Sequence, residues 1–231
     1  MEAAAGPLAY CLPIANSTAS TYEPVITLSA TYGAGGSVIA PRLASTLGLP
    51  FVDRLISADM SAQATAHSEE GLVAGEEEQT PSSWFLAYFA RVASVGVILG
   101  PDPAFDEEDD IRRRSEEALQ GLRAGEGAVV LGRAAAVVLA DRPRAFHVRL
   151  DGPADRRIAW AAVHENLDRT AATRRQNETD RARATFVKRL YREDPADPSL
   201  YHLVVDSTAF GVDATIEVIS AAASAFFRIQ Q

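Results

Sequence analysis

The sequence is poor in several features that define other classes of protein. It has a single cysteine, Cys11, which excludes an internal disulfide framework and fits a reducing compartment. Its net charge of −9 argues against a nucleic-acid-binding surface, because such surfaces need clustered positive charge. No uninterrupted apolar run reaches the length of a membrane span. We therefore expect a cytoplasmic protein that binds neither nucleic acid nor a membrane.

Metal-ligand spacing is also missing, because the four histidines are scattered along the chain and predict surface or edge-of-core positions. Residues 1–23 are mostly small and polar and lack the charged and apolar regions of a signal peptide, which predicts a mobile tail. Residues 24–231 are long enough for one domain, and the apolar fraction of 47% is sufficient for a core.

The residues from Val25 to Leu47 have the layout of a phosphate-binding site. Val25–Leu28 is rich in β-branched residues and predicts a buried strand, and apolar residues at helical spacing follow the glycines. Glycines between a strand and a helix let the backbone approach an anion, and the helix N-terminus adds partial positive charge. The candidate phosphate-binding residues are Gly33, Ala34, Gly35, Gly36 and Ser37, and the Ser37 hydroxyl is the candidate magnesium ligand.

This loop departs from the P-loop pattern G-x-x-x-x-G-K-[ST] at two positions. With Gly35 as the second glycine, Ala30 occupies the first glycine position and Gly36 the position of the lysine that normally bridges the outer phosphates. The pattern alone therefore leaves open an ordinary glycine turn in an α/β protein. Pro41 lies inside the predicted helix and removes one backbone hydrogen bond, so a kink is expected there.

Strands and helices alternate along the rest of the chain, which predicts an α/β fold with a mostly parallel sheet and helices on both faces. The later predicted strands are 49–54, 127–131, 144–150 and 203–206, and the later predicted helices include 151–165 and 212–227. Asp53 and Arg54 end the second strand at the sheet edge where ligands bind in such folds, although an exposed ion pair explains them equally well.

Two further segments have more than one interpretation. Between Ser82 and Leu99, aromatic and aliphatic side chains recur at helical spacing, which predicts a core helix or the face of a homodimer. Residues 166–190 contain six arginines, which form either a solvated helix with ion pairs or a mobile lid that closes over phosphates.

Five segments, taken in order, carry a resemblance to a known family. They read ITLSATYGAGGSVIAPRLASTLGLPFVDRLI, VVLGRAAAVVL, FHVRLDGPADRR, TDRARATFVKRLY and YHLVVDST. In this order and spacing they resemble the cytidylate kinase-like family of P-loop nucleoside monophosphate kinases. Members of this branch commonly also lack the P-loop lysine. The resemblance covers roughly residues 25–219 and implies a P-loop NTPase-type parallel sheet with an arginine-rich lid at about 166–190.

The resemblance also implies an acceptor site. Asp180 and Arg183 match the Asp-x-x-Arg pair that holds the substrate nucleotide in cytidylate kinases, and Arg133 matches the arginine that contacts the monophosphate. Asp53 and Arg54 complete the candidate acceptor residues.

The candidate catalytic residues are arginines that would neutralise the transferring phosphoryl group. Arg157 matches an arginine in the family, whereas Arg169 and Arg174 are assigned from their position in the lid alone. Two family features are absent: Ala134 stands where cytidylate kinases have an aspartate, and Trp160 occurs with Ala161 where a second arginine is expected.

Taken together, the sequence predicts transfer of the γ-phosphoryl group of ATP, with Mg²⁺, to a nucleoside monophosphate, with CMP or dCMP first. The acceptor phosphate is already ionised, so no strong general base is required. Two alternatives stay open. One is a nucleotide-binding regulatory or partner-binding protein without catalysis, and the other is a kinase of the same fold for a different small acceptor.

Overall fold

The computed structural model describes residues 22–52, 112–113, 116–117, 119–132 and 134–229. Five strands form one sheet: β1 (Val25–Ala30), β2 (Phe51–Val52), β3 (Ala128–Leu131), β4 (Ala145–Asp151) and β5 (Leu203–Asp206). The helices are α1 (Gly36–Leu47), α5 (Gln120–Arg123), α6 (Ala135–Val138), α7 (Ala154–His164), α8 (Arg169–Tyr191) and α9 (Ser207–Ile229), with a 3-10 turn at Pro198–Leu200. The helix predicted between Ser82 and Leu99 lies outside the described residues.

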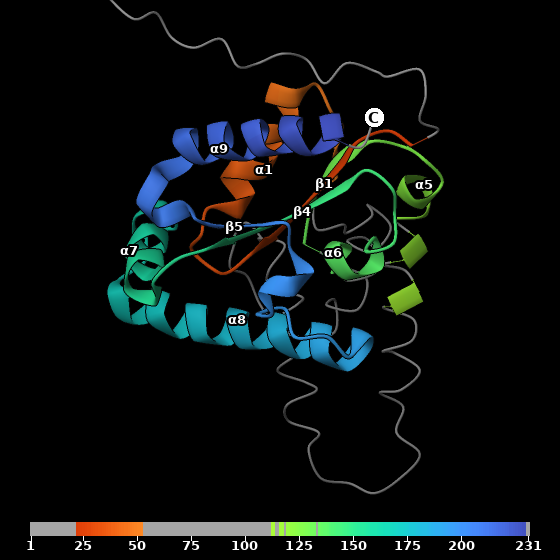
Figure 1. Ribbon diagram of the computed structural model, residues 1–231. Helices are drawn as coiled ribbons and strands as arrows, with labels where there is room; N and C mark the ends of the chain where they lie inside the picture. Colours follow the sequence, from red (N-terminus) through yellow and green to blue (C-terminus); the bar gives the residue numbers. More distant parts are fainter. Residues whose placement is uncertain (1–21, 53–111, 114–115, 118, 133, 230–231) are drawn as a thin grey trace, which may run out of the picture.

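All neighbouring strands are parallel, in the order β2-β3-β1-β4-β5, which confirms the predicted α/β sheet. In this order β1 is central, with β3 on one side and β4 on the other. The chain places β2 and β3 on one side of β1 and then β4 and β5 on the other, so the strand order reverses at β1 and ligands are expected at the carboxyl ends of these strands. The glycine loop leaves β1 at that edge (Figure 1).

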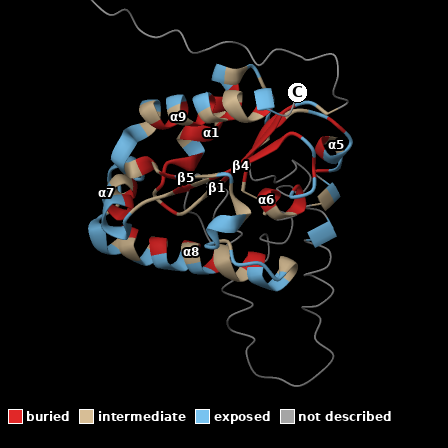
Figure 2. Ribbon diagram, in the orientation of Figure 1, coloured by how far each residue is buried: buried red, intermediate tan, exposed pale blue. Residues whose placement is uncertain are grey.

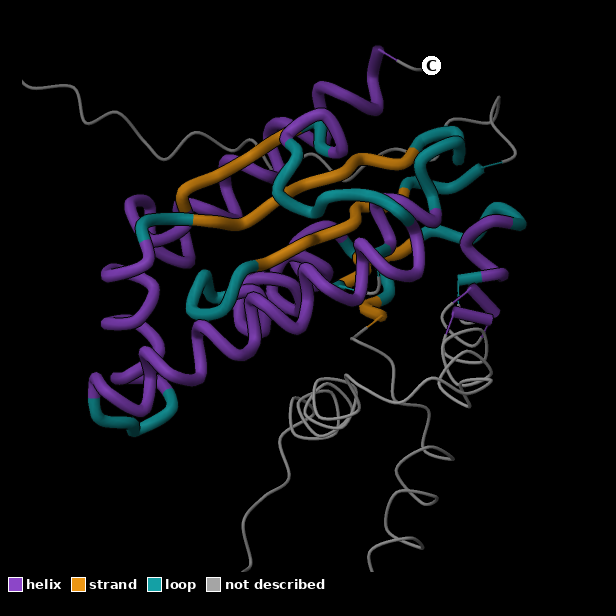
Figure 3. The backbone as a smooth tube through the Cα atoms, turned by 90° about the horizontal axis from the view of Figure 1, so that it is seen from below, coloured by secondary structure: helices purple, strands orange, loops and turns teal. Residues whose placement is uncertain are grey.

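Helices cover both faces of the sheet, as Figures 1 and 3 show. Alternate residues of β1 point to opposite faces: Ile26 and Leu28 join the core under α1 and α9, whereas Val25 joins the core beside α5 and α6. Burial follows the same pattern, with the strands and the inner helix faces buried and the outer faces exposed (Figure 2). Such central strands, covered on both faces, explain the apolar runs of the sequence.

Local sequence signals explain several helix boundaries. Helix α1 begins after Gly35 and ends at Gly48, and both glycines have left-handed backbone conformations. The helix continues through Pro41, which lies inside its bounds. Helix α8 begins after Asp168, whose carboxylate accepts a hydrogen bond from the Ala171 N–H at 2.8 Å. This capped, continuous helix occupies the segment predicted as the lid.

Helix α9 is the one described helix whose length and hydropathy would permit a membrane span. Its backbone leaves the helical conformation at Gly211, so the element consists of a short turn and a longer helix. Ile219 and Phe227 are buried in the core against the sheet. We therefore assign α9 as a core helix of this fold.

Candidate active site

The glycine loop between β1 and α1 is held close to helix α7. Gly33 has φ of 77°, and Gly35 has φ of 72°, so the loop depends on the left-handed conformation at two positions. A Cβ atom added to Gly33 would lie 2.2 Å from the carbonyl oxygen of Arg157. The first glycine of the loop is therefore needed both for its backbone conformation and for its contact with α7.

The backbone N–H groups of the loop are available to a ligand. Among the described residues, no acceptor is found for the N–H groups of Gly33, Gly35, Gly36 and Ser37. Gly36 is the first residue of α1, and the first N–H groups of a helix have no intrahelical acceptor. Several N–H donors beside a helix N-terminus form an anion-binding site, because they combine hydrogen bonds with the helix dipole.

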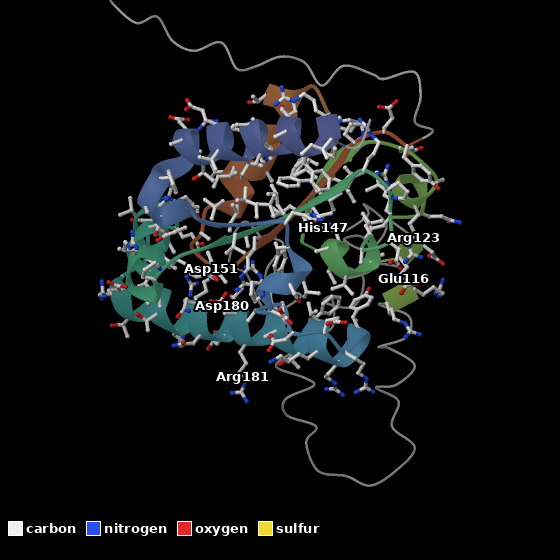
Figure 4. All side chains as sticks on the ribbon, viewed as in Figure 1. Glu116, Arg123, His147, Asp151, Asp180 and Arg181 are labelled. Atoms are coloured by element: carbon white, nitrogen blue, oxygen red, sulfur yellow. The ribbon has the colours of Figure 1, made fainter. Side chains whose placement is uncertain are left out.

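The peptide groups of Tyr32, just before the glycines, are clamped from both sides. The Asp180 carboxylate accepts a hydrogen bond from the Tyr32 N–H at 2.7 Å. The Arg157 guanidinium donates to the Tyr32 carbonyl oxygen at 2.7 Å and to the other oxygen of Asp180 at 2.8 Å. In Figure 4, Asp180 lies on the side of α8 that faces the sheet, whereas Arg181 points away. This clamp fixes the start of the loop.

Arg157 is a buried structural cation in this arrangement. Its side chain is only 8% exposed, and its Nε also donates to the Gly152 carbonyl oxygen at 2.9 Å. Gln176, one turn before Asp180 on α8, donates to Asp180 at 3.0 Å. Because breaking a buried ion pair leaves an uncompensated charge, these residues are expected to act together.

Arg183 contacts the chain just before the loop, at the end of β1. Its Nη1 donates to the Ala30 carbonyl oxygen at 2.8 Å, at the end of β1. Asp180 and Arg183, the Asp-x-x-Arg pair of the sequence, therefore both contact the backbone of the segment that leads into the glycines. Arg183 places a positive charge beside a loop that has no lysine.

The position of the missing lysine, Gly36, has no space for a side chain in this structure. A Cβ atom added to Gly36 would lie 2.7 Å from the Ala30 Cβ and 3.3 Å from the Leu131 side chain. The methyl group of Ala30, at the position where the P-loop pattern has its first glycine, thus occupies the space that a side chain at Gly36 would need. The two departures from the pattern are one coupled change.

Asp151, at the end of β4, is a second carboxylate at this edge. Its Oδ1 accepts hydrogen bonds from the Thr31 hydroxyl at 3.1 Å and from the Gly152 N–H at 2.9 Å, and Arg149 donates to Oδ2 at 2.9 Å. Burial alone would raise its pKa, but the Gly152 hydrogen bond and the Arg149 charge outweigh burial and hold the pKa below its usual value. Asp151 therefore remains ionised beside the loop.

The Tyr32 side chain ties the loop to the end of α7. Its hydroxyl donates to the Glu165 carboxylate at 2.7 Å, and Arg175 of α8 lies 3.3 Å from the same oxygen. Burial, followed by the hydrogen bond to Glu165 and its charge, raises the pKa of Tyr32, although Arg175 and Arg183 oppose this. The loop, α7 and α8 thus form one connected unit.

The other predicted site residues that the structure describes are exposed. Arg174 is exposed, 3.9 Å from Glu178 on the same helix, and Arg169 is exposed at the start of α8. Ser37 is exposed in the first turn of α1, with its hydroxyl at the surface. Three predicted acceptor residues, Asp53, Arg54 and Arg133, lie outside the described residues.

A magnesium ion would find few protein ligands here. Within the described ranges, no three His, Cys, Asp or Glu side chains cluster at metal-binding distance. Strand β3, beside β1, ends at Leu131 and so offers no carboxylate. Ser37 fits a metal that is held mainly by phosphate oxygens and water, which is how Mg²⁺ commonly binds with nucleotides.

The sequence analysis missed Tyr32, Asp151 and Glu165 as site residues. Asp151 follows a predicted strand directly, which was a usable signal. The Tyr32 contacts with Arg157, Glu165 and Asp180 join positions 125, 133 and 148 residues apart, and no local pattern predicts them.

The sequence is similar to a known family and to an individual member of it. Residues 25–209 match the sequence model of the cytidylate kinase-like family. A cytidylate kinase of Methanopyrus kandleri is 31% identical over 210 residues, covering 86% of this chain and 92% of that protein.

Solved structures were also compared. A protein from Eubacterium ventriosum, described as uncharacterized, has a TM-score of 0.53 at 18% identity and covers 87% of this chain and 98% of its own. A gluconokinase from Sinorhizobium meliloti has a TM-score of 0.45 at 17% identity, with coverages of 91% and 99%. The extent of the family match and the identity to the archaeal kinase show that this chain belongs to the cytidylate kinase-like family.

Proposed function

We propose that the protein is a nucleotide kinase that transfers the γ-phosphoryl group of ATP to a nucleoside monophosphate, with CMP or dCMP preferred. The observation that carries the proposal is the set of unpaired N–H groups at the loop and at the start of α1. Such groups suit a triphosphate, because they bind its oxygens and the helix dipole favours the charge. The name of the 31% identical relative supports CMP as the first acceptor to test.

Each group of residues has a proposed role. The residues Gly33–Ser37 bind the donor phosphates, and Ser37 contributes one ligand to Mg²⁺. Arg157 and Asp180 hold the Tyr32 peptide groups, so they position the loop rather than contact phosphate. Arg183, whose guanidinium already lies at Ala30, supplies positive charge in place of the lysine.

The remaining roles concern the acceptor and the lid. The acceptor monophosphate binds to Asp53, Arg54 and Arg133. The side of α8 that carries Arg183 contributes to the same binding site. Arg169 and Arg174, both exposed on α8, are available to approach the transferring group when ligands bind.

The proposed chemistry needs positioning more than covalent help. Phosphoryl transfer requires the two phosphates in line and their charge neutralised. Magnesium, bound with ATP, supplies part of that neutralisation. The fixed loop orients the donor, and the arginines stabilise charge that spreads over the transferring oxygens. The acceptor phosphate is already ionised and needs no strong base.

The test is magnesium-dependent ADP formation by the purified protein across CMP, dCMP, UMP, AMP and GMP. Turnover with one acceptor is expected, and Arg183→Ala should lower kcat at least about a hundredfold, as loss of a group that stabilises transition-state charge does. The matched control is Arg181→Ala, because Arg181 is on the same helix but points away from the sheet (Figure 4). Equal losses in both variants would contradict the role of Arg183.

A second candidate function has its own support. Ala30 leaves no space for a side chain at Gly36, and no carboxylate occurs within β3, so among the described residues neither the P-loop lysine nor a carboxylate of that strand is available. These features favour a nucleotide-binding regulatory protein without catalysis. That function predicts a higher melting temperature with ATP but no turnover with any acceptor.

A further inference from the structure

A cavity lies at the amino ends of the strands, at the opposite end of the sheet from the glycine loop. Its lining comes from the chain before β4, the residue before β5 and the end of α9: Ala140, Arg142, Pro143, Arg144, Ala145, His202 and Phe226. Its volume is about 490 Å³, within the range of small-molecule sites. Strand β4 begins at this cavity and ends at Asp151, so the cavity and the loop lie at opposite ends of one strand.

Arg144 is the unusual residue of this cavity. It is 5% exposed, and its Nε and Nη1 atoms are buried with no hydrogen-bond partner. Its guanidinium lies 5.6 Å from the centre of the Phe227 ring, and it forms no ion pair with any described carboxylate. Arginine stays charged in proteins, so these unpaired donors are costly unless an anion reaches them.

The neighbouring Arg142 does not neutralise this charge. It is also buried, and its guanidinium donates only to backbone carbonyl oxygens, including that of Leu122 at 2.5 Å and that of Glu126 at 2.7 Å. Burial, with a smaller contribution from Arg144, lowers the pKa of Arg142 despite opposing effects of Tyr22 and Glu23. Two cations therefore share this edge of the sheet, and Arg142 is satisfied by hydrogen bonds whereas Arg144 is not.

The rest of the lining is apolar or aromatic. The rings of His202 and Phe226 lie with centroids 4.7 Å apart, and Ala140, Pro143 and Ala145 provide aliphatic surface. A bare inorganic anion would use Arg144 but leave these walls without contacts. A flat ring that carries an anionic group would use both, because its faces and edges pack on aromatic side chains.

We propose that this cavity binds an aromatic or heteroaromatic oxyanion, whose phosphate or carboxylate group pairs with Arg144 and whose ring packs against Phe226 and His202. The planar guanidinium fork suits both kinds of oxyanion, since each accepts two parallel hydrogen bonds. The inference concerns a site separate from the loop, so it stands whether or not the protein transfers phosphate.

The test is isothermal titration calorimetry with phenyl phosphate, benzoate and inorganic phosphate, at saturating magnesium and ATP to occupy the loop. One ring-bearing probe should bind with a stoichiometry near one and at least about tenfold more tightly than inorganic phosphate. Tighter binding of phenyl phosphate would assign a phosphate group to the natural ligand, and tighter binding of benzoate a carboxylate. No binding of either ring-bearing probe, or equal binding of inorganic phosphate, would overturn the proposal.

Arg144→Met provides the second test, because methionine has a similar length without the charge. It should weaken probe binding at least about tenfold. In the ligand-free protein it should raise the melting temperature, because it removes a buried charge with unpaired donors. The control is Arg228→Met, which removes one charge from the exposed end of α9 and should change neither quantity. Unchanged binding in Arg144→Met, or a lower melting temperature without ligand, would contradict an open anion site.

Discussion

At the scale of single residues, the loop differs from the usual P-loop by a coupled pair. Ala30 and Gly36 are in direct steric competition, because a Cβ atom at Gly36 would lie 2.7 Å from the Ala30 Cβ. The absence of lysine is therefore not a single loss that one substitution would reverse. A lysine at position 36 would fit only if Ala30, at the end of β1, were also replaced by glycine.

This competition predicts a non-additive mutant cycle. Gly36→Lys alone should lower the free energy of unfolding by about 2 kcal/mol, because the added side chain overpacks the contact with Ala30. Ala30→Gly combined with Gly36→Lys should recover most of that loss, with a coupling energy of about 1–2 kcal/mol. Urea unfolding of the four proteins measures the cycle. Additive effects would show that the two positions do not compete.

The buried clamp on Tyr32 gives a second residue-scale prediction. Asp180→Asn keeps an acceptor for the Tyr32 N–H but removes the charge that pairs with Arg157, whose side chain is 8% exposed. Loss of this partner should lower the free energy of unfolding by about 3 kcal/mol. The control is Arg174→Ala, since its ion pair with Glu178 is exposed and should not change stability measurably. Equal effects of both substitutions on chemical unfolding would contradict a buried clamp.

At the scale of elements, the loop, α7 and α8 are locked together by contacts between distant segments. Gly33 touches the backbone of α7 at Arg157, and Asp180 of α8 holds the adjacent peptide. Helix α8 thus packs directly against the start of the loop through Asp180. The exposed arginines of α8 take no part in these contacts with the loop.

Gly33 and Gly48 allow a matched test of this packing. Both have positive φ, 77° and 67°, but an added Cβ meets the Arg157 carbonyl at Gly33 and nothing within 4 Å at Gly48. Gly48→Ala should lower the free energy of unfolding by only about 1 kcal/mol, because alanine is strained in the left-handed conformation. Gly33→Ala should cost about 3 kcal/mol or more, because α7 must also move. Thermal and urea unfolding without nucleotide measure both, and similar costs would show that α7 does not constrain the loop.

At the scale of the whole molecule, periodicity and glycine placement were enough to predict the sheet and most helix positions. The strand predicted at 203–206 agrees with β5, and the helix predicted at 212–227 lies inside α9. The glycine loop was recognisable because its conformation needs particular residues at adjacent positions. The roles of Asp180 and Arg157 were harder to predict, since their contacts with Tyr32 depend on how α7 and α8 pack.

The burial of one histidine also could not be predicted from the sequence. Spacing gave no reason to expect a metal site at the histidines. The expected surface or edge-of-core position is wrong for His147, which is 4% exposed inside the sheet. One ring nitrogen lies 2.8 Å from the Thr27 hydroxyl, and the other is buried without a partner. Both polar and apolar residues occur at alternating positions of a strand. The sequence pattern therefore does not show that this ring is buried, and only the packed structure does.

This buried ring predicts how the stability of the whole protein depends on pH. Burial, with a smaller effect of His202, lowers the pKa of His147 from 6.5 to about 4. Between these values the unfolded chain binds a proton that the folded protein does not, so the free energy of unfolding falls as the pH drops from 6.5 toward 4. The loss attributable to His147 should reach about 3 kcal/mol near pH 4.

Urea unfolding across this range, in wild type and His147→Gln, measures that contribution. Glutamine can still bond to Thr27 but does not titrate, so the variant should lose much less stability between pH 6.5 and pH 4. The lowered pKa of Asp151 gives stability that is lost as the pH falls through the ordinary range of a carboxyl group and below it, so most of that loss lies below pH 4 and is the same in both proteins. Parallel pH profiles for the two proteins would show that His147 is not the group that titrates, and the acid sensitivity would then have to be assigned to another group.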